Sequence, residues 1–359
     1  MAKAEITNRY RAESLRKFAA SLFIAAGMDA DKAVVVAEVL VTGDMVGQRT
    51  HGIALCPQYI DQIEQGLMAT HGEPSVIRDS DSLFVWDGAY LPGPWLVSQA
   101  IGQACERVGA QSVVTGVIRR SHHIACLTAS LKQATDRGYL ILLASSDPAF
   151  GFVAPHGGKE PLLTPNPVAF GYPGTQQPVW IDISTSITTV GMARQKAAAG
   201  ERFAHPWLMD AAGRPSNDPH VLDPGAGGAL LPLGGLEYGH KGFGLALMVE
   251  MLTHGLAGFG RPDAEKRWGA GVFLQVLDPQ AFGGREDFLR LADDMTARCH
   301  ANAPRDPASP VRLPGEMAQQ RMREAERSGI ELAAPIRAAL ADKARQYGVP
   351  LPEPINARV

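Results

Sequence analysis

Residues 44–52 carry the first candidate for acid–base chemistry, because His51 follows the hydroxyl residue Thr50 at a turn between two predicted helices. An imidazole exchanges a proton near neutral pH, and a neighbouring hydroxyl can fix which ring nitrogen carries that proton. A histidine that merely caps a turn gives the same local pattern. The segment alone therefore leaves a proton donor and a structural histidine as alternatives.

Two further segments are associated with predicted strands and could bind a ligand. Residues 119–127 place a polar cluster, including His122 and His123, between a strand and a helix, where α/β proteins hold ligands. Residues 156–186 contain paired glycines and hydroxyl-rich turns, whose free backbone N–H groups can face phosphates. A solvated basic loop and ordinary turns are the alternative interpretations.

A fourth segment, residues 238–244, sets Lys241 among glycines, directly before a helix predicted over residues 242–256. The N-terminus of a helix attracts anions, so this lysine is a candidate anion-binding residue. An exposed lysine beside a flexible turn is the alternative.

The most recognisable enzyme motifs are missing. No G-x-G-x-x-G follows a predicted strand, and the sequence has no G-x-x-x-x-G-K-[ST], G-x-S-x-G or H-E-x-x-H. These searches exclude the usual dinucleotide fingerprint, the phosphate loop, the hydrolase elbow and the zinc-protease motif. They do not exclude the chemistries that these motifs serve.

Composition indicates an ordinary globular protein of 359 residues, 45% of them hydrophobic and 20% charged. The 34 basic and 37 acidic residues give a net charge of −3, without the basic stripe typical of nucleic-acid binding. Apolar runs are shorter than the roughly 20 residues of a membrane span, and the N-terminus lacks the apolar core of a secretion signal. Cys56, Cys105, Cys126 and Cys299 are widely spaced, which indicates reduced thiols. We therefore expect a cytoplasmic protein that binds no nucleic acid, membrane or metal.

Hydrophobic periodicity predicts the elements that must position the candidate residues. Three prolines between residues 304 and 310 indicate a linker. We expect an α/β domain over residues 76–310 and a discontinuous helical domain made of residues 1–75 and 311–359. Helices are predicted over residues 12–26, 29–46, 53–63, 95–108, 242–256, 287–299, 316–327 and 336–347, and strands over 83–86, 112–118, 139–144, 168–172 and 179–183.

These segments, together with several others in the same order, resemble the type 2 malate/L-lactate dehydrogenase family along nearly the whole chain. Relatives in that family include ureidoglycolate, sulfolactate and diketogulonate dehydrogenases, and the piperideine-2-carboxylate and pyrroline-2-carboxylate reductases. The residues that carry the resemblance are Asp44, Thr50, His51, Gly52, Ile53 and Tyr59, Ser121, His122 and His123, residues 154–158, Asn166 and Pro167, residues 182–186, Gly191, residues 213–215, Asp218 and Pro219, Lys241 and Gly242, residues 314–316, and Gly329 and Ile330.

The resemblance implies an α/β fold with a three-layer mixed-sheet cofactor domain of non-Rossmann type, NAD or NADP as cofactor, and a homodimer. It implies hydride transfer to or from C2 of a small 2-oxo or 2-hydroxy acid. His51 is then the catalytic proton donor and acceptor, with Thr50 beside it, and we assign Arg49 and Asn166 to the substrate. The residues that match cofactor-contacting positions are His123, Ile124, Ala125, Cys126, Leu127, Asp182, Ile183, Ser184, Val190, Gly191, Lys241, Gly242, Gly315 and Glu316.

Three residues depart from the family pattern on the substrate side. Leu55 replaces an arginine, Pro165 replaces a threonine, and Met192 replaces an aspartate or lysine. We interpret these changes as an active reductase with an atypical, more apolar substrate. The alternatives are a cyclic imino-acid reductase, which residues 123–127 favour and Met192 opposes, and a nucleotide-binding relative without turnover.

Overall fold

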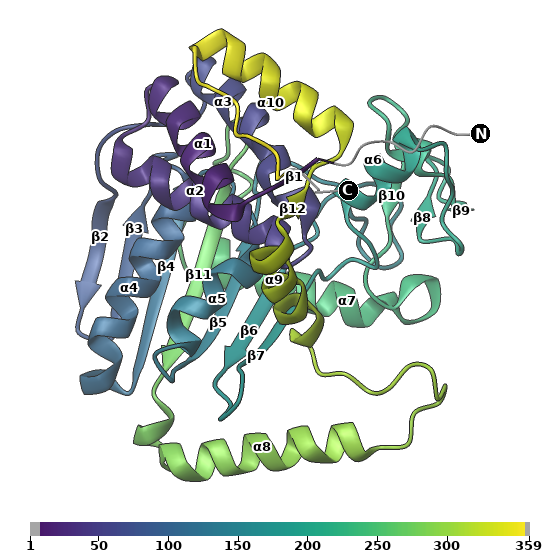
Figure 1. The fold of residues 1–359 in the computed structure, drawn as a ribbon. Helices are drawn as coiled ribbons and strands as arrows, with labels where there is room; N and C mark the ends of the chain where they lie inside the picture. The colour runs from purple at the N-terminus through teal and green to yellow at the C-terminus, as the bar shows by residue number, and fades with distance from the viewer. Residues whose placement is uncertain (1–7, 356–359) are drawn as a thin grey trace.

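The computed structural model describes residues 8–355. A seven-stranded mixed sheet runs through its centre in the order β2-β3-β4-β11-β5-β6-β7 (Figure 1). Only β3 and β4 pair in parallel, and the other neighbours in this sheet are antiparallel. The strands are β2 (Ser75–Ser80), β3 (Leu83–Asp87), β4 (Val113–Ser121), β5 (Leu140–Ser146), β6 (Val168–Tyr172), β7 (Val179–Ile183) and β11 (Ala270–Leu277).

Strand β11 occupies the middle of the sheet, although the sequence analysis assigned no element to it. Leu274 pairs with Gly116 of β4 on one side and with Leu143 of β5 on the other. Val272, Leu274 and Val276 are fully buried. The apolar, β-branched character of this stretch was a signal that could have identified the strand.

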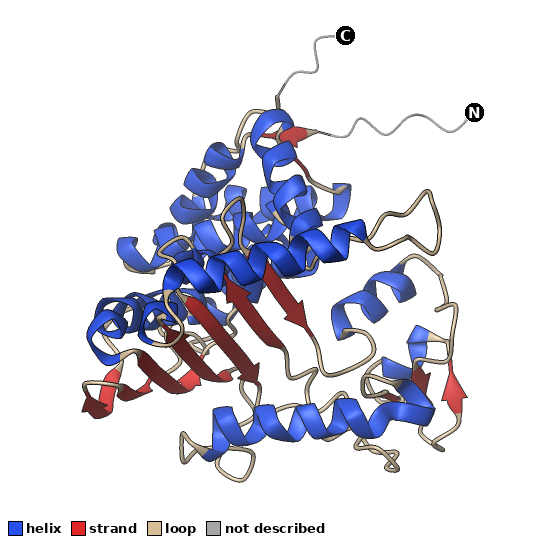
Figure 2. Cartoon of the chain, turned by 90° about the horizontal axis from the view of Figure 1, so that it is seen from below, coloured by secondary structure: helices blue, strands red, loops and turns tan. Residues whose placement is uncertain are grey.

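Helices cover both faces of the sheet, which gives the three layers visible in Figure 2. On one face lie α4 (Gly93–Gln111) and α5 (Leu127–Thr135), with α1 (Ala12–Ala25) and α2 (Ala30–Met45) packed beyond them. On the other face, α7 (Gly235–Glu250) continues into a π-helical turn, η4 (Met251–Gly255). There Val249 packs with Val117 and Phe273 of the sheet. The expected mixed-sheet α/β fold is therefore confirmed.

The helical segments from the two ends of the chain lie side by side (Figure 1). Helix α10 (Ala334–Tyr347) packs on α1 and on α3 (Cys56–Glu64), while α9 (Glu316–Ser328) packs on α2. Strand β1 (Arg9–Tyr10) pairs with β12 (Ile330–Glu331). One apolar core joins these helices to the helical layer over the sheet. The division into domains at residues 75 and 310 stays a prediction.

Several predicted elements need correction. The helix expected at residue 242 begins at Gly235, so Lys241 lies inside a helix rather than at its N-terminus. The glycines there permit close packing, because a Cβ on Gly242 would lie 2.3 Å from the backbone nitrogen of Leu233. The segment 53–63 divides into a 3₁₀ turn, η2 (Ile53–Leu55), and α3.

The remaining elements are short or lie toward the periphery. Helix α8 (Arg285–Ala301) agrees with the prediction for residues 287–299, whereas α6 (Val190–Ala198) was not predicted. Within the described residues, no helix is long and apolar enough to span a membrane. The other elements are the 3₁₀ turns η1 (Arg49–His51), η3 (Pro219–Leu222) and η5 (Pro279–Ala281), and a small sheet of β8 (Leu208–Met209), β9 (Pro215–Ser216) and β10 (Ala229–Leu230).

Candidate active site

The candidate residues gather along one edge of the central sheet. The strand registers place the C-terminal ends of β3, β4, β5 and β7 and the N-terminal ends of β6 and β11 at this edge. Residues 119–127, 164–167 and 182–186 all adjoin these strand ends. Segments that the sequence only suggested separately are thus brought together by the sheet.

Backbone strain is concentrated at the same edge. Ala89, Tyr90, Arg120, Ala125 and Asn166 have φ angles of 47°, 60°, 50°, 58° and 41°. Such values cost a residue with a Cβ about 1–3 kcal/mol and recur at functional sites. Among the described residues, the only other non-glycine residue with a positive φ is Ser112, which precedes β4 at the opposite end of the sheet.

His51 ends the 3₁₀ turn η1, which connects α2 to the next turn, η2. Its Nδ1 lies 3.0 Å from the hydroxyl oxygen of Thr50. If His51 exchanges its catalytic proton at Nε2, Nδ1 keeps its own proton in both the charged and the neutral ring and donates this bond to the Thr50 hydroxyl. Burial lowers the pKa of His51, and the negative charge of Asp182 acts in the opposite direction.

Asp182, at the end of β7, gathers three donors on one carboxylate oxygen. Its Oδ2 accepts hydrogen bonds from the side chain of Gln48 at 2.9 Å, the hydroxyl of Thr128 at 2.7 Å and the backbone N–H of Thr128 at 3.1 Å. Within residues 8–355, Oδ1 takes part in no hydrogen bond. Asp182 also joins the His51 turn to the start of α5.

An aromatic cluster stands beside His51. The ring of His123 lies 5.7 Å from that of His51 and stacks on Trp268 at 4.4 Å, measured between centroids. The hydroxyl of Tyr59 is 2.8 Å from Nδ1 of His123 and donates to the backbone oxygen of the same residue at 3.1 Å. Burial lowers the pKa of His123 well below its usual range, and that of the adjacent His122 to about 3. Both rings are therefore neutral at physiological pH.

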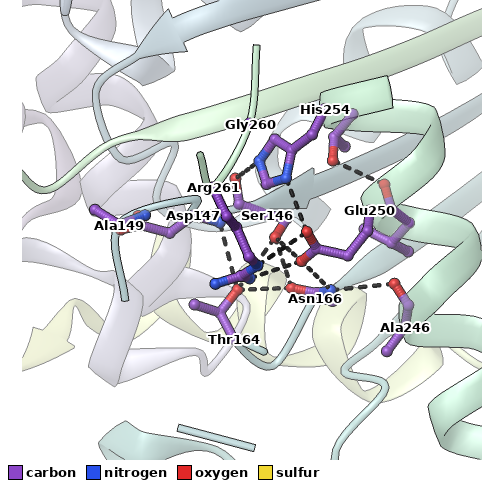
Figure 3. Close-up of polar contacts among 12 residues, drawn as sticks. Ser146, Asp147, Ala149, Thr164, Asn166, Ala246, Glu250, His254, Gly260 and Arg261 are labelled. Carbon is purple, nitrogen blue, oxygen red and sulfur yellow. Dashed lines mark hydrogen bonds and ion pairs between the residues drawn. The ribbon is translucent and has the colours of Figure 1, made fainter. Parts of the chain in front are cut away.

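A buried polar network lies behind this edge (Figure 3). The Asn166 side chain donates to Glu250 at 2.9 Å and to the backbone oxygen of Ala246 at 3.2 Å, and it accepts from Thr164. Its oxygen and Glu250 Oε1 share the single hydroxyl proton of Ser146. Asn166 is fully buried, and these contacts occupy both donors and the acceptor of its amide. Its assignment to the substrate stays a prediction, and the network shows that it shapes the turn at residues 164–167.

Glu250 is the centre of this network. Arg261 contacts it at 2.7 and 3.1 Å, and Nδ1 of His254 lies 2.9 Å away. Burial alone would raise the pKa of Glu250, but the bonds from His254 and Arg261 outweigh burial and hold it well below its usual range. The carboxylate therefore stays ionised and locks the end of β5 to α7.

The structure places other predicted cofactor residues around the same region. Gly191 approaches Thr50 so closely that a Cβ would lie 3.1 Å from the threonine Cβ. Gly242 faces the backbone of Thr185, and Gly315 faces the backbone of Trp180, two residues before Asp182. Residues 123–127, with Ile124, Ala125, Cys126 and Leu127 buried, lead into α5 next to Asp182.

Other predicted residues are less closely tied to His51. Ile183 is exposed, and the Ser184 hydroxyl donates to the backbone of Ser186. Glu316 bonds His300 and the N–H of Leu313, and Lys241 lies over the ring of Tyr238. Arg49 is exposed, and Val190 opens α6 directly before Gly191.

The three departures from the family pattern occupy different settings. Leu55 is 9% exposed and belongs to the apolar core, so no charge stands where the family arginine is expected. The backbone oxygen of Pro165 accepts two bonds from Thr185. Met192 is 41% exposed in the first turn of α6, next to Gly191.

The chain shares its fold with a solved structure over nearly its whole length. A malate dehydrogenase from Entamoeba histolytica has a TM-score of 0.91 and 24% identity, over 97% of this chain and 100% of that one. The chain belongs to the malate/L-lactate dehydrogenase family, whose model matches residues 10–341.

Two curated relatives match over most of their length. A malate/(S)-sulfolactate dehydrogenase from Methanothermus fervidus is 28% identical over 89% of this chain and 92% of its own. A Δ1-pyrroline-2-carboxylate/Δ1-piperideine-2-carboxylate reductase from Pseudomonas syringae pv. tomato is 29% identical over 82% and 84%. The protein is therefore an enzyme of the oxidoreductase class.

Sequence reasoning missed Gln48, Thr128, Trp268 and Glu250 as parts of this region. Gln48 lies within the segment 44–52 and Thr128 directly follows residues 119–127. Their side chains bond each other at 3.1 Å and both bond Asp182, which lies more than 50 positions along the chain from either. Trp268 lies just before β11, for which the sequence analysis predicted no strand. Glu250 ends the apolar stretch 242–250 of α7, and a single carboxylate in such a stretch is a signal for a buried partner.

Proposed function

We propose that the protein is a nicotinamide-dependent oxidoreductase that moves hydride to or from C2 of a small 2-oxo or 2-hydroxy acid. The observation that carries this proposal is the pairing of His51 with Thr50 at 3.0 Å, beside Asp182 and the neutral ring of His123. Hydride arriving at C2 leaves negative charge on the carbonyl oxygen, and a proton from His51 quenches it. In the reverse direction, neutral His51 accepts the hydroxyl proton.

The described residues fit a nicotinamide dinucleotide. Asp182 uses Oδ2 to accept the N–H of Thr128 in the first turn of α5, and its Oδ1 has no partner among the described residues, so we assign Oδ1 to a hydroxyl or carboxamide of the cofactor. We assign residues 123–127, 182–184, 190–191, 241–242 and 315–316 to NAD or NADP. When bound, the reduced cofactor supplies the hydride. His51, Thr50 and Gly191 then form the surface that holds the reacting carbonyl.

The first test combines a substrate panel with one variant. Small 2-oxo acids and cyclic 2-imino acids are assayed with NADH and with NADPH, and cofactor affinity is followed by tryptophan fluorescence. We expect His51→Ala to lower kcat by at least about 100-fold while the cofactor Kd stays within about threefold. Unchanged turnover in this variant would remove His51 from the chemistry. Cofactor binding without turnover of any substrate would favour a nucleotide-binding protein.

Reduction of a cyclic imino acid is the second candidate, because the reductase from Pseudomonas syringae pv. tomato is as similar as the dehydrogenases. The same residues would serve it, since His51 can protonate an imine nitrogen as well as an oxygen. Met192 provides no carboxylate beside Thr50 for that reaction. The panel separates the two reactions directly.

Leu55 is the residue that we connect with substrate choice. An arginine there would add a charge-assisted hydrogen bond to a substrate carboxylate, worth about 1.5–3 kcal/mol. Leu55 lies in the apolar core, so the variant is first checked for folding by its urea midpoint. In the folded variant, we expect Leu55→Arg to raise kcat/KM for pyruvate or oxaloacetate by about tenfold or more. Leu55→Met is the matched control, because it keeps an apolar side chain of similar volume. Equal kcat/KM values in both variants would show that this position does not select the substrate.

We also propose a cytoplasmic homodimer. Its four cysteines are free thiols, and the outward side of α7 and η4 exposes Leu247, Met248 and Met251 by 44%, 41% and 60%. A second copy of the chain is the occupant that we assign to this apolar surface. Met248→Glu is expected to shift the sedimentation coefficient from dimer to monomer, whereas Val76→Glu on β2 leaves it unchanged. A monomeric wild-type chain would refute the assignment.

A further inference from the structure

Asp44 stands in the last turn of α2 and directs its carboxylate at the turn that carries His51. Its Oδ2 accepts a hydrogen bond from the backbone N–H of Ile53 at 2.6 Å, and the residue is only 9% exposed. Ile53 opens η2, which leads into α3. Asp44 therefore caps the start of the next helical segment from the helix before it, and residues 45–52 form the connection that this bond closes.

This placement is unfavourable for a carboxylate. The C-terminal turn of a helix carries partial negative charge, so an acidic side chain is disfavoured there. Burial raises the pKa of Asp44 to about 7, while the bond from Ile53 and the charge of Arg49 act in the opposite direction. Among the described residues, the bond to Ile53 is the only hydrogen bond of this side chain. Asp44 therefore fixes the turn before Ile53, although burying its carboxylate lowers the stability of the protein.

Two glycines allow the turn to lie against α2. A Cβ on Gly52 would be 2.4 Å from Oδ2 of Asp44, and a Cβ on Gly43 would be 2.8 Å from the backbone oxygen of His51. Neither glycine has a positive φ, so close approach rather than backbone conformation requires them. The backbone of Gln48 adds bonds of 2.8 Å to Gly43 and to His51. The main chain on both sides of the imidazole is therefore fixed to α2.

We propose that Asp44 is a positioning residue, whose carboxylate holds the turn of Thr50, His51 and Gly52 against α2 and thereby fixes the imidazole of His51. This inference rests on the proposed role of His51. Asp44 itself touches neither substrate nor cofactor in this assignment. A shift of about 1 Å in a catalytic group can cost about 100-fold in rate, so a hydrogen bond that sets the backbone beside His51 acts directly on kcat.

The activity test uses Asp44→Ala, Asp44→Asn and a matched control. Asp44→Ala is expected to lower kcat by about 10- to 100-fold with little change in the Kd for NADH. Asn can accept the same bond from Ile53, so Asp44→Asn recovers kcat to within about threefold of wild type. Asp278→Ala removes an equally buried carboxylate that accepts the N–H of Gln280 at the opposite end of the sheet, and kcat stays unchanged.

The His51→Ala background separates positioning from general loss of structure. If Asp44 acts through His51, adding Asp44→Ala to His51→Ala lowers kcat by less than about twofold. An equal loss of kcat in both backgrounds overturns the proposal, and so does wild-type kcat in Asp44→Ala.

An NMR experiment tests the positioning of His51 without measuring turnover. Its result therefore holds even if the proposed function is wrong. In a ¹H–¹³C histidine spectrum, the His51 signal is assigned as the one absent from His51→Ala. We expect Asp44→Ala to shift or broaden this signal, Asp44→Asn to restore it, and Asp278→Ala to leave it in place. An unmoved His51 signal in Asp44→Ala overturns the positioning role, whatever the enzyme's activity.

Discussion

Glu250→Gln is the substitution whose effect can best be worked out from the geometry. Oε1 accepts bonds from Ser146 at 2.7 Å, Asn166 at 2.9 Å and Arg261 at 2.7 Å, and Oε2 accepts from His254 at 2.9 Å and Arg261 at 3.1 Å. A glutamine replaces one of these oxygens by an NH₂ group, which then faces donors. At least one of the two bonds from Arg261 is therefore lost, whichever way the amide turns, and the remaining bonds lose the negative charge of the carboxylate.

The expected loss of stability follows from the lost Arg261 bond and from the charge. A hydrogen bond to a charged group is worth about 1.5–3 kcal/mol. Removing one partner of a buried ion pair costs about 3–5 kcal/mol. The Arg261 side chain is 22% exposed, so water offsets part of its loss. We expect Glu250→Gln to lower the free energy of unfolding by about 3 kcal/mol.

The assay is urea denaturation at pH 7, followed by tryptophan fluorescence. Glu64→Gln is the matched control, because Glu64 also accepts bonds from Lys343, Gln346 and Tyr347, but its side chain is 33% exposed. That control is expected to cost less than about 1 kcal/mol. Equal losses in the two variants, or a loss below about 1 kcal/mol for Glu250→Gln, would refute the reasoning.

The pH dependence provides a second check on the same carboxylate. The folded protein holds the pKa of Glu250 well below its usual range, so its contribution to stability is present above the unfolded pKa of about 4.3. That contribution is lost as the pH falls toward the folded value. The free energy of unfolding should therefore differ most between wild type and Glu250→Gln at pH 7, and this difference should shrink below about pH 4.

Three further predictions follow from single contacts. Thr50→Val removes the hydroxyl 3.0 Å from His51 and should lower kcat about tenfold in steady-state assays, with the cofactor Kd unchanged. Because burial raises the pKa of Asp44 to about 7, wild type loses stability as the pH rises from about 4 to 7. The free energy of unfolding in urea is measured for Asp44→Asn and for wild type at pH 4 and at pH 8. The value for Asp44→Asn minus that for wild type should be about 2–4 kcal/mol larger at pH 8 than at pH 4. Gly315 has a φ of 89°, and a Cβ on it would lie 2.8 Å from the backbone nitrogen of Trp180. Gly315→Ala should therefore lower the free energy of unfolding in urea by more than about 2 kcal/mol.

Sequence periodicity succeeded where an element's own residues determine its structure. Strands β6 and β7 match the predicted residues at both ends, and α1 and α2 agree to within one residue at each end, because each carries an apolar repeat between clear stops. The start of α7 was wrong by seven residues, since Gly242 is required by the approach of Leu233 rather than by a turn. Such close packing is a property of the fold, and a short segment does not reveal it.

The site was predictable in parts and not as a whole. The adjacent residues Thr50 and His51 were identified together, and the structure shows the contact between their side chains. The link between Gln48 and Asp182 crosses 134 positions and depends on where β7 ends, so it required the sheet. Asn166 was identified from its motif, but only the contacts with Glu250 and Ala246 show how its side chain is held.

The central place of β11 has a consequence for how the chain is made. Residues 75–183 supply the other six strands as two groups of three, and each group leaves its inner edge unpaired until residues 270–277 have emerged from the ribosome. Open strand edges lined with apolar side chains recruit other chains. A nascent chain or a truncation that stops near residue 265 should therefore aggregate or bind chaperones. One late segment would then decide whether the two half-sheets become a single native structure.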